Sequence, residues 1–381
     1  MFSRIYPSVN QQVRKTVDSV SLPSARRVAD ILKKSLSETL SLAETAELLE
    51  IGRHEEASEQ SGILRGHMMG SFLDKGGPVR IISPSYLSSH CVDTCGYCSF
   101  SAKRKETERT RLGLEQLDQE VGYIMSGGNR VIEFTLATDP EFTPGVLSDY
   151  VRKTARILEG PGSGVLLCSD HLTLEGYKEL RSAGLSGMVQ WDETLDEVRF
   201  RQWHNGSPRK GLFMERMDAH DRATMAGLRV ATGILFGLSD YRYDVLMQIA
   251  KARYLMDEYG MKPFVFGTPR IKPTGCRNVR SPNDVDDFAY EIALMAYKIA
   301  EPGVGRWLQT REDPQMNFRM LLPGDAFTYN CGEVKPGGHF VNVRLNPDKG
   351  GQFRVREMGK EMFLERLSAL GLSADFAWMN P

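Results

Sequence analysis

Three cysteines are concentrated in the segment HCVDTCGYCSF, which spans residues 90–100. Cys91, Cys95 and Cys98 have the spacing C-x3-C-x2-C, and thiolates this close together are typical ligands of zinc or of iron–sulfur clusters. Both kinds of site normally take four protein ligands. The segment supplies only three thiols, so the identity of the fourth ligand decides what the site can do.

Two interpretations of this triad remain open from the residues alone. In the first, a structural zinc ion takes its fourth ligand from His90 or from the distant Cys331. In the second, a [4Fe–4S] cluster leaves one iron open for an exogenous ligand, just as a catalytic zinc keeps one position free. Zinc sites usually combine two C-x2-C halves, so the observed spacing favours the cluster.

The composition is that of a globular protein, because 41% of the 381 residues are hydrophobic, 25% are charged and the formal net charge is −1. A chain this close to neutrality lacks the basic footprint of a nucleic-acid-binding protein. No apolar run reaches the roughly 18 residues of a membrane span, and residues 1–20 lack the apolar core of a secretory signal. We therefore expect a cytoplasmic protein that binds neither nucleic acid nor membrane.

Three further cysteines, Cys168, Cys276 and Cys331, are scattered along the chain. Disulfide frameworks belong mainly to small secreted proteins, and this chain is large and has no export signal. These three thiols are therefore expected to be small buried residues that take no part in chemistry.

The elements that position the cysteine loop begin with helical patterns between residues 22 and 72, where Ser41 and Glu44 form a capping-box sequence. From residue 79 onward, eight strand-like runs alternate with helix-like runs. Such alternation predicts an α/β protein with a parallel sheet, and eight repeats fit a (β/α)8 TIM-type barrel. A doubly wound open sheet is the alternative, but no glycine-rich phosphate loop follows the first strand.

We expect a helical segment packed on the barrel over residues 1–78, the barrel over 79–345 and a short C-terminal extension over 346–381. Active sites of such barrels lie at the C-terminal ends of the strands. The cysteine loop directly follows the first predicted strand, residues 79–88, so the triad should lie at this end of the barrel.

The loop resembles that of the radical S-adenosylmethionine enzymes, in which an aromatic residue, here Tyr97, precedes the last cysteine. The resemblance implies that Cys91, Cys95 and Cys98 bind a [4Fe–4S] cluster whose open iron is chelated by S-adenosylmethionine. An electron from the cluster would then generate a 5′-deoxyadenosyl radical, which abstracts a hydrogen atom from the substrate. Tyr97 would pack on the adenine.

The resemblance extends over residues 35–375 and is greatest with the tyrosine lyase (2-iminoacetate synthase) and tryptophan lyase branch, which neighbours biotin synthase and methylornithine synthase. It implies that Glu193 and Arg216 contact S-adenosylmethionine. A carboxylate suits the ribose or amino group, and a guanidinium can fork onto the methionyl carboxylate. A structural ion pair at a helix end is the alternative role for both residues.

Three further candidates for cofactor binding follow from the same resemblance. Asp139 and Glu141, in TLATDPEF, occupy the place of a short acidic segment that touches the methionyl amino group, although the usual glycine–glutamate pair is absent. Gly233, at the fifth predicted strand, either lets the backbone approach the adenosine closely or simply ends the strand.

The candidate substrate-binding residues lie in FGTPRIKP, which resembles the proline–arginine motif that follows the sixth strand in these lyases. Arg270 would bind the substrate carboxylate, because a guanidinium suits bidentate carboxylate binding. Lys272 is a second candidate. The alternative for both residues is a charge on a surface loop.

One segment departs from the lyases, because YNCGEVKPGG stands where they carry a serine–alanine–glycine–serine stretch. A changed lining at this place implies a changed substrate. Glu333 is a candidate acid or base, or else a solvated loop carboxylate, and Cys331 is a candidate hydrogen donor, or else a small core residue. His204 is a candidate proton shuttle, with a structural role at a helix end as the alternative.

These features predict a carbon–carbon lyase or rearrangement enzyme that acts on a small amino acid and receives electrons from a carrier such as flavodoxin or ferredoxin. A methylornithine-synthase-like mutase or a biotin-synthase-like sulfur insertion enzyme is the alternative within the family. From another class, the alternative is a non-catalytic iron–sulfur or zinc scaffold. A member that binds S-adenosylmethionine without radical chemistry is the third possibility.

Overall fold

The residues that the computed structural model of the protein describes are 1–272, 279, 281, 283–329, 337–341, 352 and 358–379. Two of the candidate site residues, Cys331 and Glu333, lie outside this part of the chain.

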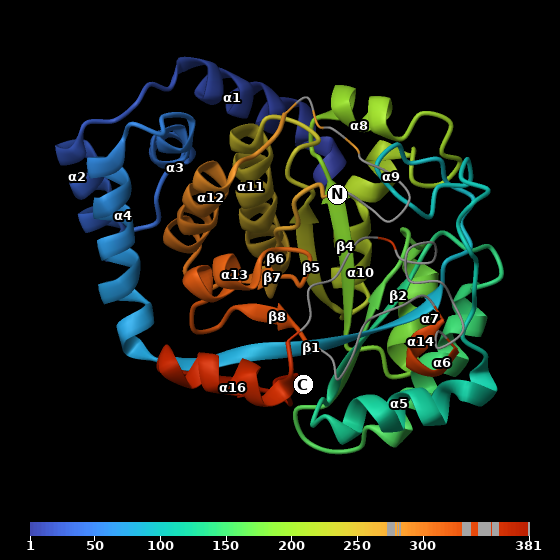
Figure 1. Ribbon diagram of the computed structural model, residues 1–381. Coiled ribbons are helices and arrows are strands. Elements are labelled where there is room, and N and C mark those ends of the chain that lie inside the picture. Colours follow the sequence, from blue (N-terminus) through green and yellow to red (C-terminus); the bar gives the residue numbers. More distant parts are fainter. Residues whose placement is uncertain are drawn as a thin grey trace.

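Eight parallel strands form a closed barrel at the centre of the molecule (Figure 1). The strands are β1 (Gly77–Ser88), β2 (Val131–Leu136), β3 (Gly164–Cys168), β4 (Gly187–Glu193), β5 (Arg229–Ile234), β6 (Val265–Gly267), β7 (Gly305–Leu308) and β8 (Ala326–Thr328). Strands β2 to β8 pair in sequence order, and β1 closes the ring by pairing with both β8 and β2. The (β/α)8 barrel predicted from the alternating pattern is therefore confirmed.

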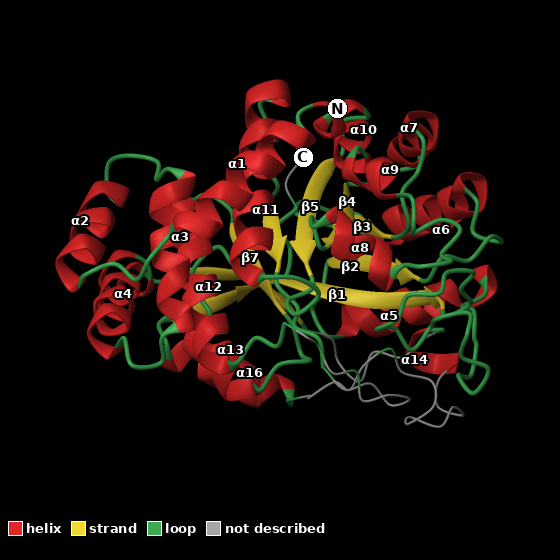
Figure 2. Ribbon diagram, turned by 90° about the horizontal axis from the view of Figure 1, so that it is seen from above, coloured by secondary structure: helices red, strands yellow, loops and turns green. Residues whose placement is uncertain are grey.

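Helices surround the barrel on its outer side (Figure 2). The α-helices after β1 are α5 (Leu117–Ser126), α6 (Pro144–Ile157), α7 (Leu174–Ser182), α8 (Glu197–Trp203), α9 (Phe213–Met217), α10 (Ala219–Met225), α11 (Tyr241–Tyr259), α12 (Asp287–Ala300), α13 (Pro314–Met320), α14 (Gly338–Val341) and α16 (Lys360–Ala369). Short 3₁₀ turns are η1 (Phe2–Arg4), η2 (Ile51–Arg53), η3 (Leu73–Lys75) and η4 (Leu114–Gln116).

Four helices precede the barrel and pack beside α11 and α12 (Figure 1). They are α1 (Tyr6–Ser19), α2 (Ala25–Ser35), α3 (Leu42–Glu50) and α4 (Ser58–Ser71). The capping box predicted at the start of α3 is confirmed, because the Ser41 hydroxyl accepts a hydrogen bond from Glu44 N and the Glu44 carboxylate accepts one from Ser41 N. The Tyr241 hydroxyl donates to the Leu49 carbonyl at 2.7 Å and ties α11 to α3.

The interior of the barrel is a packed apolar core to which every strand contributes. Its members, one from each strand in order, are Ile82, Val131, Leu166, Val189, Ala231, Val265, Trp307 and Ala326. Trp191 packs edge-to-face on Trp307, with ring centroids 5.2 Å apart. The two indoles close the core on the side where the strands end, so the space beyond them is left for a site.

The other end of the barrel is closed by the C-terminal segment. Strand β9 (Leu372–Asp375) pairs in parallel with the start of β1, and Trp378 Nε1 then donates to the Ile81 carbonyl at 2.9 Å. Met379 N donates to the carbonyl of Gly162, which lies just before β3. Access to the barrel is therefore from the end that carries the cysteine loop.

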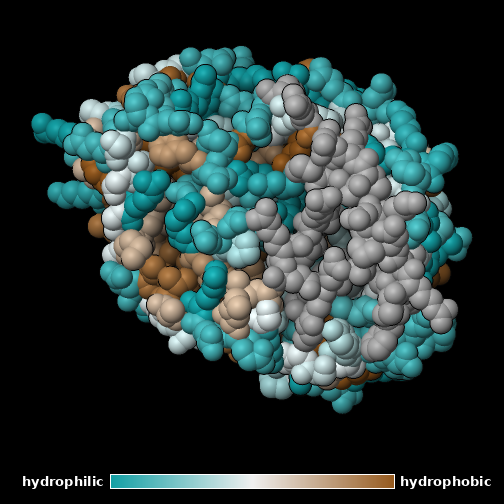
Figure 3. Space-filling view, in the orientation of Figure 1, coloured by the Kyte–Doolittle hydropathy of each residue, from teal (hydrophilic) through white to brown (hydrophobic). Residues whose placement is uncertain are grey.

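The described residues on the face seen in the orientation of Figure 1 are mainly hydrophilic, with hydrophobic patches among them (Figure 3). Within the described ranges, none of the helices combines the length and the apolar character needed to cross a membrane.

Candidate active site

A cavity of about 190 Å³ opens at the C-terminal ends of the barrel strands. All eight strands, or the loops directly after them, supply lining residues, which include Tyr86, Cys91, Asp93, Cys95, Tyr97, Cys98, Glu133, Cys168, Asp170, Trp191, Glu193, Lys210, Arg216, Lys272, Gln309, Arg311 and Thr328. Acidic, basic, aromatic and thiol side chains therefore face one shared space. The cysteine triad lies at the C-terminal ends of the strands, as the placement of the loop after the first predicted strand led us to expect.

The three cysteines of the loop all line this cavity, and Cys95 is only 4% exposed. Asp93 ties the cysteine loop to the segment after α8, because its Oδ1 accepts hydrogen bonds from Arg209 N and Lys210 N at 3.0 Å each. Gly96 N also donates to the Trp203 carbonyl at 2.9 Å. The segment after α8 therefore holds the thiols in place.

The residues present fit an iron–sulfur cluster. The three thiols are free and face a common cavity rather than a common point, and within the described part of the chain no three Cys, His, Asp or Glu side chains converge as ligands of a single ion. The thiolates of an iron–sulfur cluster bind different irons and do not converge on one ion. They therefore need to surround a shared space of this kind. Burial raises the pKa of the Cys91 and Cys95 thiols, so it disfavours their thiolate forms. Coordination to a cation would stabilise these thiolates.

Two buried polar atoms of cavity-lining residues lack a hydrogen-bond partner within the described part of the chain. Asp93 Oδ2 and Arg216 Nε make no hydrogen bond within the part of the chain that the structure describes, although both residues are almost fully buried. A buried polar group left without a partner costs roughly 1–3 kcal/mol. Their position in the cavity lining is consistent with a polar ligand that completes the site.

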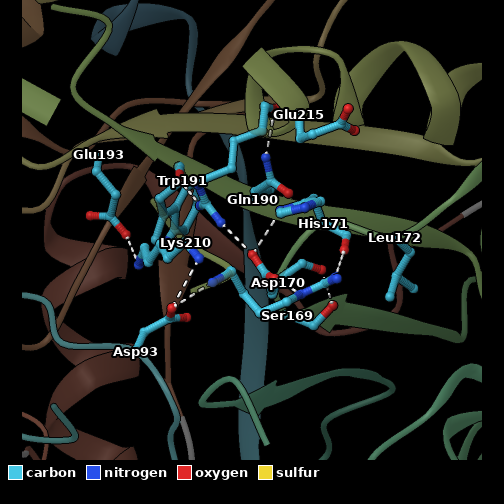
Figure 4. A network of polar contacts seen from close by, with 12 residues as sticks. Asp93, Ser169, Asp170, His171, Leu172, Gln190, Trp191, Glu193, Lys210 and Glu215 are labelled. Carbon is cyan, nitrogen blue, oxygen red and sulfur yellow. Dashed lines mark hydrogen bonds and ion pairs between the residues drawn. The ribbon is translucent and has the colours of Figure 1, made fainter. Parts of the chain in front are cut away.

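Glu193, one of the predicted cofactor-binding residues, ends β4 in a strained conformation. Its φ of 69° is the only positive φ of a non-glycine residue among those described, and such a conformation costs about 1–3 kcal/mol. The register between β4 and β5 shifts at the same point. The strained turn directs the carboxylate into the cavity, where it pairs with the Lys210 ammonium (Figure 4). Burial would raise the pKa of Glu193, but Lys210 and Arg216 lower it below its ordinary value.

Arg216 forms the second ion pair of the cavity, with Asp170. Its Nη1 donates to Asp170 Oδ1 at 2.9 Å and its Nη2 donates to the Trp191 carbonyl at 2.6 Å. Asp170 follows β3 and also accepts from Arg209 Nε at 3.0 Å. Glu193 and Arg216 thus lie at the same cavity as the cysteines, but each already has a partner from this chain.

Tyr97 lies against His204, which is itself buried. The His204 Nδ1 lies 2.8 Å from the Phe200 carbonyl, which can only accept, so Nδ1 carries the proton and Nε2 accepts from the Tyr97 hydroxyl at 2.9 Å. Burial and the nearby Lys210 ammonium lower the pKa of His204 to about 3. His204 does not line the cavity; it is neutral and holds Tyr97, which does.

The structure does not bring Asp139 and Glu141 to the cavity lining. Arg111 donates to Asp139 from Nε at 2.7 Å and from Nη2 at 3.0 Å, and Ser88 Oγ donates to the same carboxylate at 2.6 Å. The exposed Glu141 pairs with Arg111 at 3.0 Å. These acids form an ion-pair cluster beside the cysteine loop.

Gly233 makes room for Trp191. A Cβ atom at this position would lie 2.2 Å from Trp191 Cε3, and a Cβ at Gly267 on the next strand would meet the same ring. The two glycines of β5 and β6 therefore form a slot for the indole that lines the cavity. Gly233 itself does not line the cavity.

Arg270 follows β6 as expected, but its guanidinium is directed at neighbouring parts of this chain. It donates to both carboxylate oxygens of Glu312, at 3.1 and 2.6 Å, to Asp287 at 2.7 Å and to the Val285 carbonyl at 3.0 Å. Lys272 pairs with the same Glu312 at 3.0 Å and does line the cavity. Arg270 therefore fixes Glu312, and Glu312 in turn holds Lys272 at the cavity.

Several cavity residues were not singled out from the sequence, namely Asp93, Glu133, Cys168, Asp170, Lys210 and Arg311. Glu133, Cys168 and Asp170 lie in or just after predicted strands, which is a weak signal for polar residues at the barrel mouth. Lys210 and Arg311 lie in loops, where a charged residue is ordinarily solvated. Only the closed barrel brings these side chains together.

No family model matches the chain, but sequence relatives are found among curated proteins. The 2-iminoacetate synthases of Escherichia coli (strain K12) and Salmonella typhimurium (strain LT2) are 27% and 26% identical, over 70% and 69% of this chain and the same shares of theirs. The [FeFe] hydrogenase maturase subunit HydE of Thermotoga maritima is 23% identical, over 71% of this chain and 68% of its own.

Solved structures with the same fold include the FeFe-hydrogenase maturase HydG from Carboxydothermus hydrogenoformans. It matches with a TM-score of 0.83 and 24% identity, covering 98% of this chain and 85% of that one. Methylornithine synthase matches with a TM-score of 0.71 and 15% identity, covering 91% and 97%. At these identities the structural likeness shows the shared fold.

The barrel, the cysteine loop at its mouth and the sequence relatives support an enzyme of the radical S-adenosylmethionine type. Its homologues include the 2-iminoacetate synthases, so the chain lies close to the tyrosine lyase branch of these enzymes.

Proposed function

We propose that the protein cleaves S-adenosylmethionine at a [4Fe–4S] cluster and uses the resulting radical to take a hydrogen atom from a small amino-acid-like substrate, whose carbon–carbon bond is then cleaved or rearranged. The observation that carries this proposal is that Cys91, Cys95 and Cys98 line one cavity at the mouth of the barrel. These three thiolates would hold three irons, and the fourth would remain open to the amino and carboxylate groups of S-adenosylmethionine.

The charges of the cavity suit a zwitterionic ligand. Glu193 pairs with Lys210 and Asp170 pairs with Arg216, so two anions and two cations line the same space. An ammonium group can be received by a carboxylate and a carboxylate by a guanidinium with little rearrangement, because each group only exchanges one charged partner for another. Glu193 and Arg216 are therefore proposed to contact the methionyl part of the ligand. Asp139 and Glu141 would act on this ligand only through Arg111 and the cysteine loop.

Tyr97 and Gly233 support the same ligand in different ways. His204 accepts the hydrogen bond of the Tyr97 hydroxyl and fixes the ring at the cavity wall, where the ring is available to pack on the adenine. Gly233 would act indirectly, because the space it leaves lets Trp191 reach the cavity. His204 is thus proposed as a positioning residue that keeps Tyr97 oriented.

The substrate carboxylate is proposed to bind between Lys272 and Arg311. Both residues line the cavity, and burial lowers the pKa of Arg311, which an anionic ligand would counteract. Arg270 contributes by holding Glu312, which pairs with Lys272 at 3.0 Å. Glu333 is proposed as an acid or base, and Cys331 as a hydrogen donor to radicals formed on the substrate.

The test is anaerobic reconstitution of the full chain with iron and sulfide, followed by addition of S-adenosylmethionine and a one-electron reductant. A flavodoxin or ferredoxin would supply the electron in the cytoplasm. We expect 5′-deoxyadenosine, and its amount should rise when the substrate is present in a panel of L-amino acids. Fragments of the amino acid would indicate a lyase and an isomer a mutase. A protein with an intact cluster that forms no 5′-deoxyadenosine would contradict the proposal.

A further inference from the structure

Glu133 and Cys168 lie side by side in the cavity without a role in the site described so far. Glu133 is an inward residue of β2, and Cys168 ends the neighbouring β3, where it pairs in register with Thr135. Both residues line the same cavity as the three cysteines of the loop. The thiol that seemed inert in the sequence therefore faces the space in which the chemistry takes place.

Glu133 differs from the other buried carboxylates of the barrel mouth. Glu193, Asp170 and Glu312 each pair with a lysine or an arginine, whereas Glu133, at 6% exposure, has no ion-pair partner within the described ranges. Burial raises the pKa of Glu133 to about 8, and hydrogen bonds from the Thr135 and Cys168 side chains only partly oppose this effect. At neutral pH the carboxyl group therefore carries a proton.

Cys168 keeps its proton as well. Burial and the Glu133 carboxyl raise the pKa of this thiol well above its ordinary value, while Lys210 and Arg216 lower it and Glu193 raises it. An S–H bond thus faces the cavity next to a carboxylic acid. The buried Asp93 Oδ2 and Arg216 Nε have no hydrogen-bond partner among the described residues. Both residues line the cavity, so a polar ligand there could supply the missing hydrogen bonds.

We propose that Cys168 donates a hydrogen atom to carbon-centred radicals formed in this cavity and that Glu133 returns the proton that the thiol loses. This assignment rests on the proposed function. The S–H bond of Cys168 breaks homolytically, a C–H bond forms on the radical, and a thiyl radical remains on Sγ. One electron from the low-potential reductant that supplies the cluster and one proton from the Glu133 carboxyl restore the thiol, and Glu133 then takes a proton from water.

The pairing makes chemical sense because the two partners supply different halves of a hydrogen atom. A thiol is a good hydrogen-atom donor because its S–H bond is weak, but each donation leaves the sulfur one electron and one proton short. A carboxyl group that is protonated at neutral pH and lies beside the thiol can pass that proton directly to the sulfur. A purely structural cysteine would need no such neighbour.

The first test uses the full reconstituted chain in D₂O with S-adenosylmethionine and dithionite, without added substrate or exogenous thiols. The Cys168 thiol exchanges with solvent, so the 5′-deoxyadenosine formed by the wild type should carry deuterium on its methyl group. In Cys168→Ser, whose O–H bond is too strong to donate, the label should fall to natural abundance while 5′-deoxyadenosine still forms. Glu133→Gln keeps the thiol and should label in the first turnover but slow in later ones.

The second test needs neither cluster nor S-adenosylmethionine. Iodoacetamide is added to the apoprotein between pH 7 and 10, and alkylation of the Cys168 peptide is followed by mass spectrometry. Glu133→Gln removes the charge that raises the thiol pKa, so Cys168 should alkylate faster in this variant than in the wild type above pH 8. Glu141→Gln, an exposed carboxylate outside the cavity lining, serves as the control and should leave the rate unchanged.

The outcomes separate this proposal from the function on which it rests. Equal label in wild type and Cys168→Ser, or equal alkylation rates in wild type and Glu133→Gln, would overturn the role of the pair while leaving the proposed function intact. A protein with an intact cluster that forms no 5′-deoxyadenosine would overturn both.

Discussion

The Glu193 carboxylate pairs with the Lys210 ammonium at the barrel mouth, and Glu193 does so from a left-handed backbone conformation with φ of 69°. Strain of this kind persists only where the surrounding structure holds it, and it is frequent at functional sites. Leu235 N donates to the Glu193 carbonyl at 2.7 Å, so β5 helps to fix the turn. The strand ends in a conformation that aims a buried carboxylate at the cavity.

Removal of Lys210 should destabilise the protein far more than removal of a surface cation. In Lys210→Met the buried Glu193 loses its nearest positive charge, and we expect a loss of about 2–3 kcal/mol in the free energy of unfolding. The matched control is Arg201→Met, which breaks the exposed Arg201–Glu197 pair and should cost less than about 0.5 kcal/mol. Urea denaturation at pH 7 measures both.

The same pair predicts an acid dependence of stability. The pKa of Glu193 is lowered in the folded protein, so its contribution is complete above the unfolded pKa of about 4.3 and is lost as the pH falls through the lower folded value. Lys210→Met should weaken this dependence below pH 4. An unchanged acid profile in the variant would contradict the assignment.

The strain at Glu193 can be measured separately from its charge. Glu193→Gly and Glu193→Ala both remove the carboxylate, but only glycine adopts a positive φ without cost. We expect the glycine variant to be more stable than the alanine variant by about 1 kcal/mol. In an unstrained strand the order would be reversed, because glycine gains more entropy on unfolding.

His204 should lower the free energy of unfolding as the pH falls from 6.5 to 3. Its pKa is lowered to about 3 in the folded state, so the unfolded chain binds a proton that the folded protein refuses over this range. The free energy of unfolding should therefore fall by up to about 1.4 kcal/mol per pH unit from this residue alone.

His204→Gln removes this titration and should flatten the stability profile between pH 6.5 and 3, while its amide can still accept from the Tyr97 hydroxyl. The unaltered profile in this variant would mean that another group is responsible. His54, a partly exposed histidine paired with Glu50 and Glu56, is the control position for substitution by glutamine.

Substitution of Arg270 and of Arg311 should affect different properties of the protein. Arg270→Lys loses the bidentate contact with Glu312 and should lower the free energy of unfolding by about 2–3 kcal/mol. Arg311→Lys should mainly weaken the stimulation of S-adenosylmethionine cleavage by the amino acid substrate, with the half-saturating concentration raised about tenfold, or about 1.4 kcal/mol. If Arg270→Lys instead raised this concentration with unchanged stability, the carboxylate would belong to Arg270.

The barrel and the cysteine loop could be predicted because their signals are local. Alternating strand and helix patterns define the barrel, and the triad lies within one short segment directly after β1. The partners of charged side chains could not be predicted in the same way. Arg270 follows β6 as expected, yet its guanidinium is taken by Glu312, which is 42 residues further along the chain.

The side-chain packing inside the barrel could not be predicted from the sequence either. The sequence suggests that Gly233 lets the backbone approach the adenosine or ends the strand, whereas in the structure Trp191 fills the place of its missing side chain. Cys168 was expected to be an inert core thiol, but it lines the cavity beside Glu133. Such contacts depend on which strands are neighbours, and that is fixed only when β1 pairs with β8 and closes the ring.

Cys91, Cys95 and Cys98 are proposed to hold a cluster with one open iron that binds S-adenosylmethionine. The most direct measurement is the electron paramagnetic resonance spectrum of the reduced, reconstituted protein before and after addition of S-adenosylmethionine, with an iron content of about four per chain. We predict a reduced-cluster signal that changes on addition and that is absent in Cys95→Ala. A bound zinc ion without iron, or a cluster signal that S-adenosylmethionine leaves unchanged, would contradict the claim.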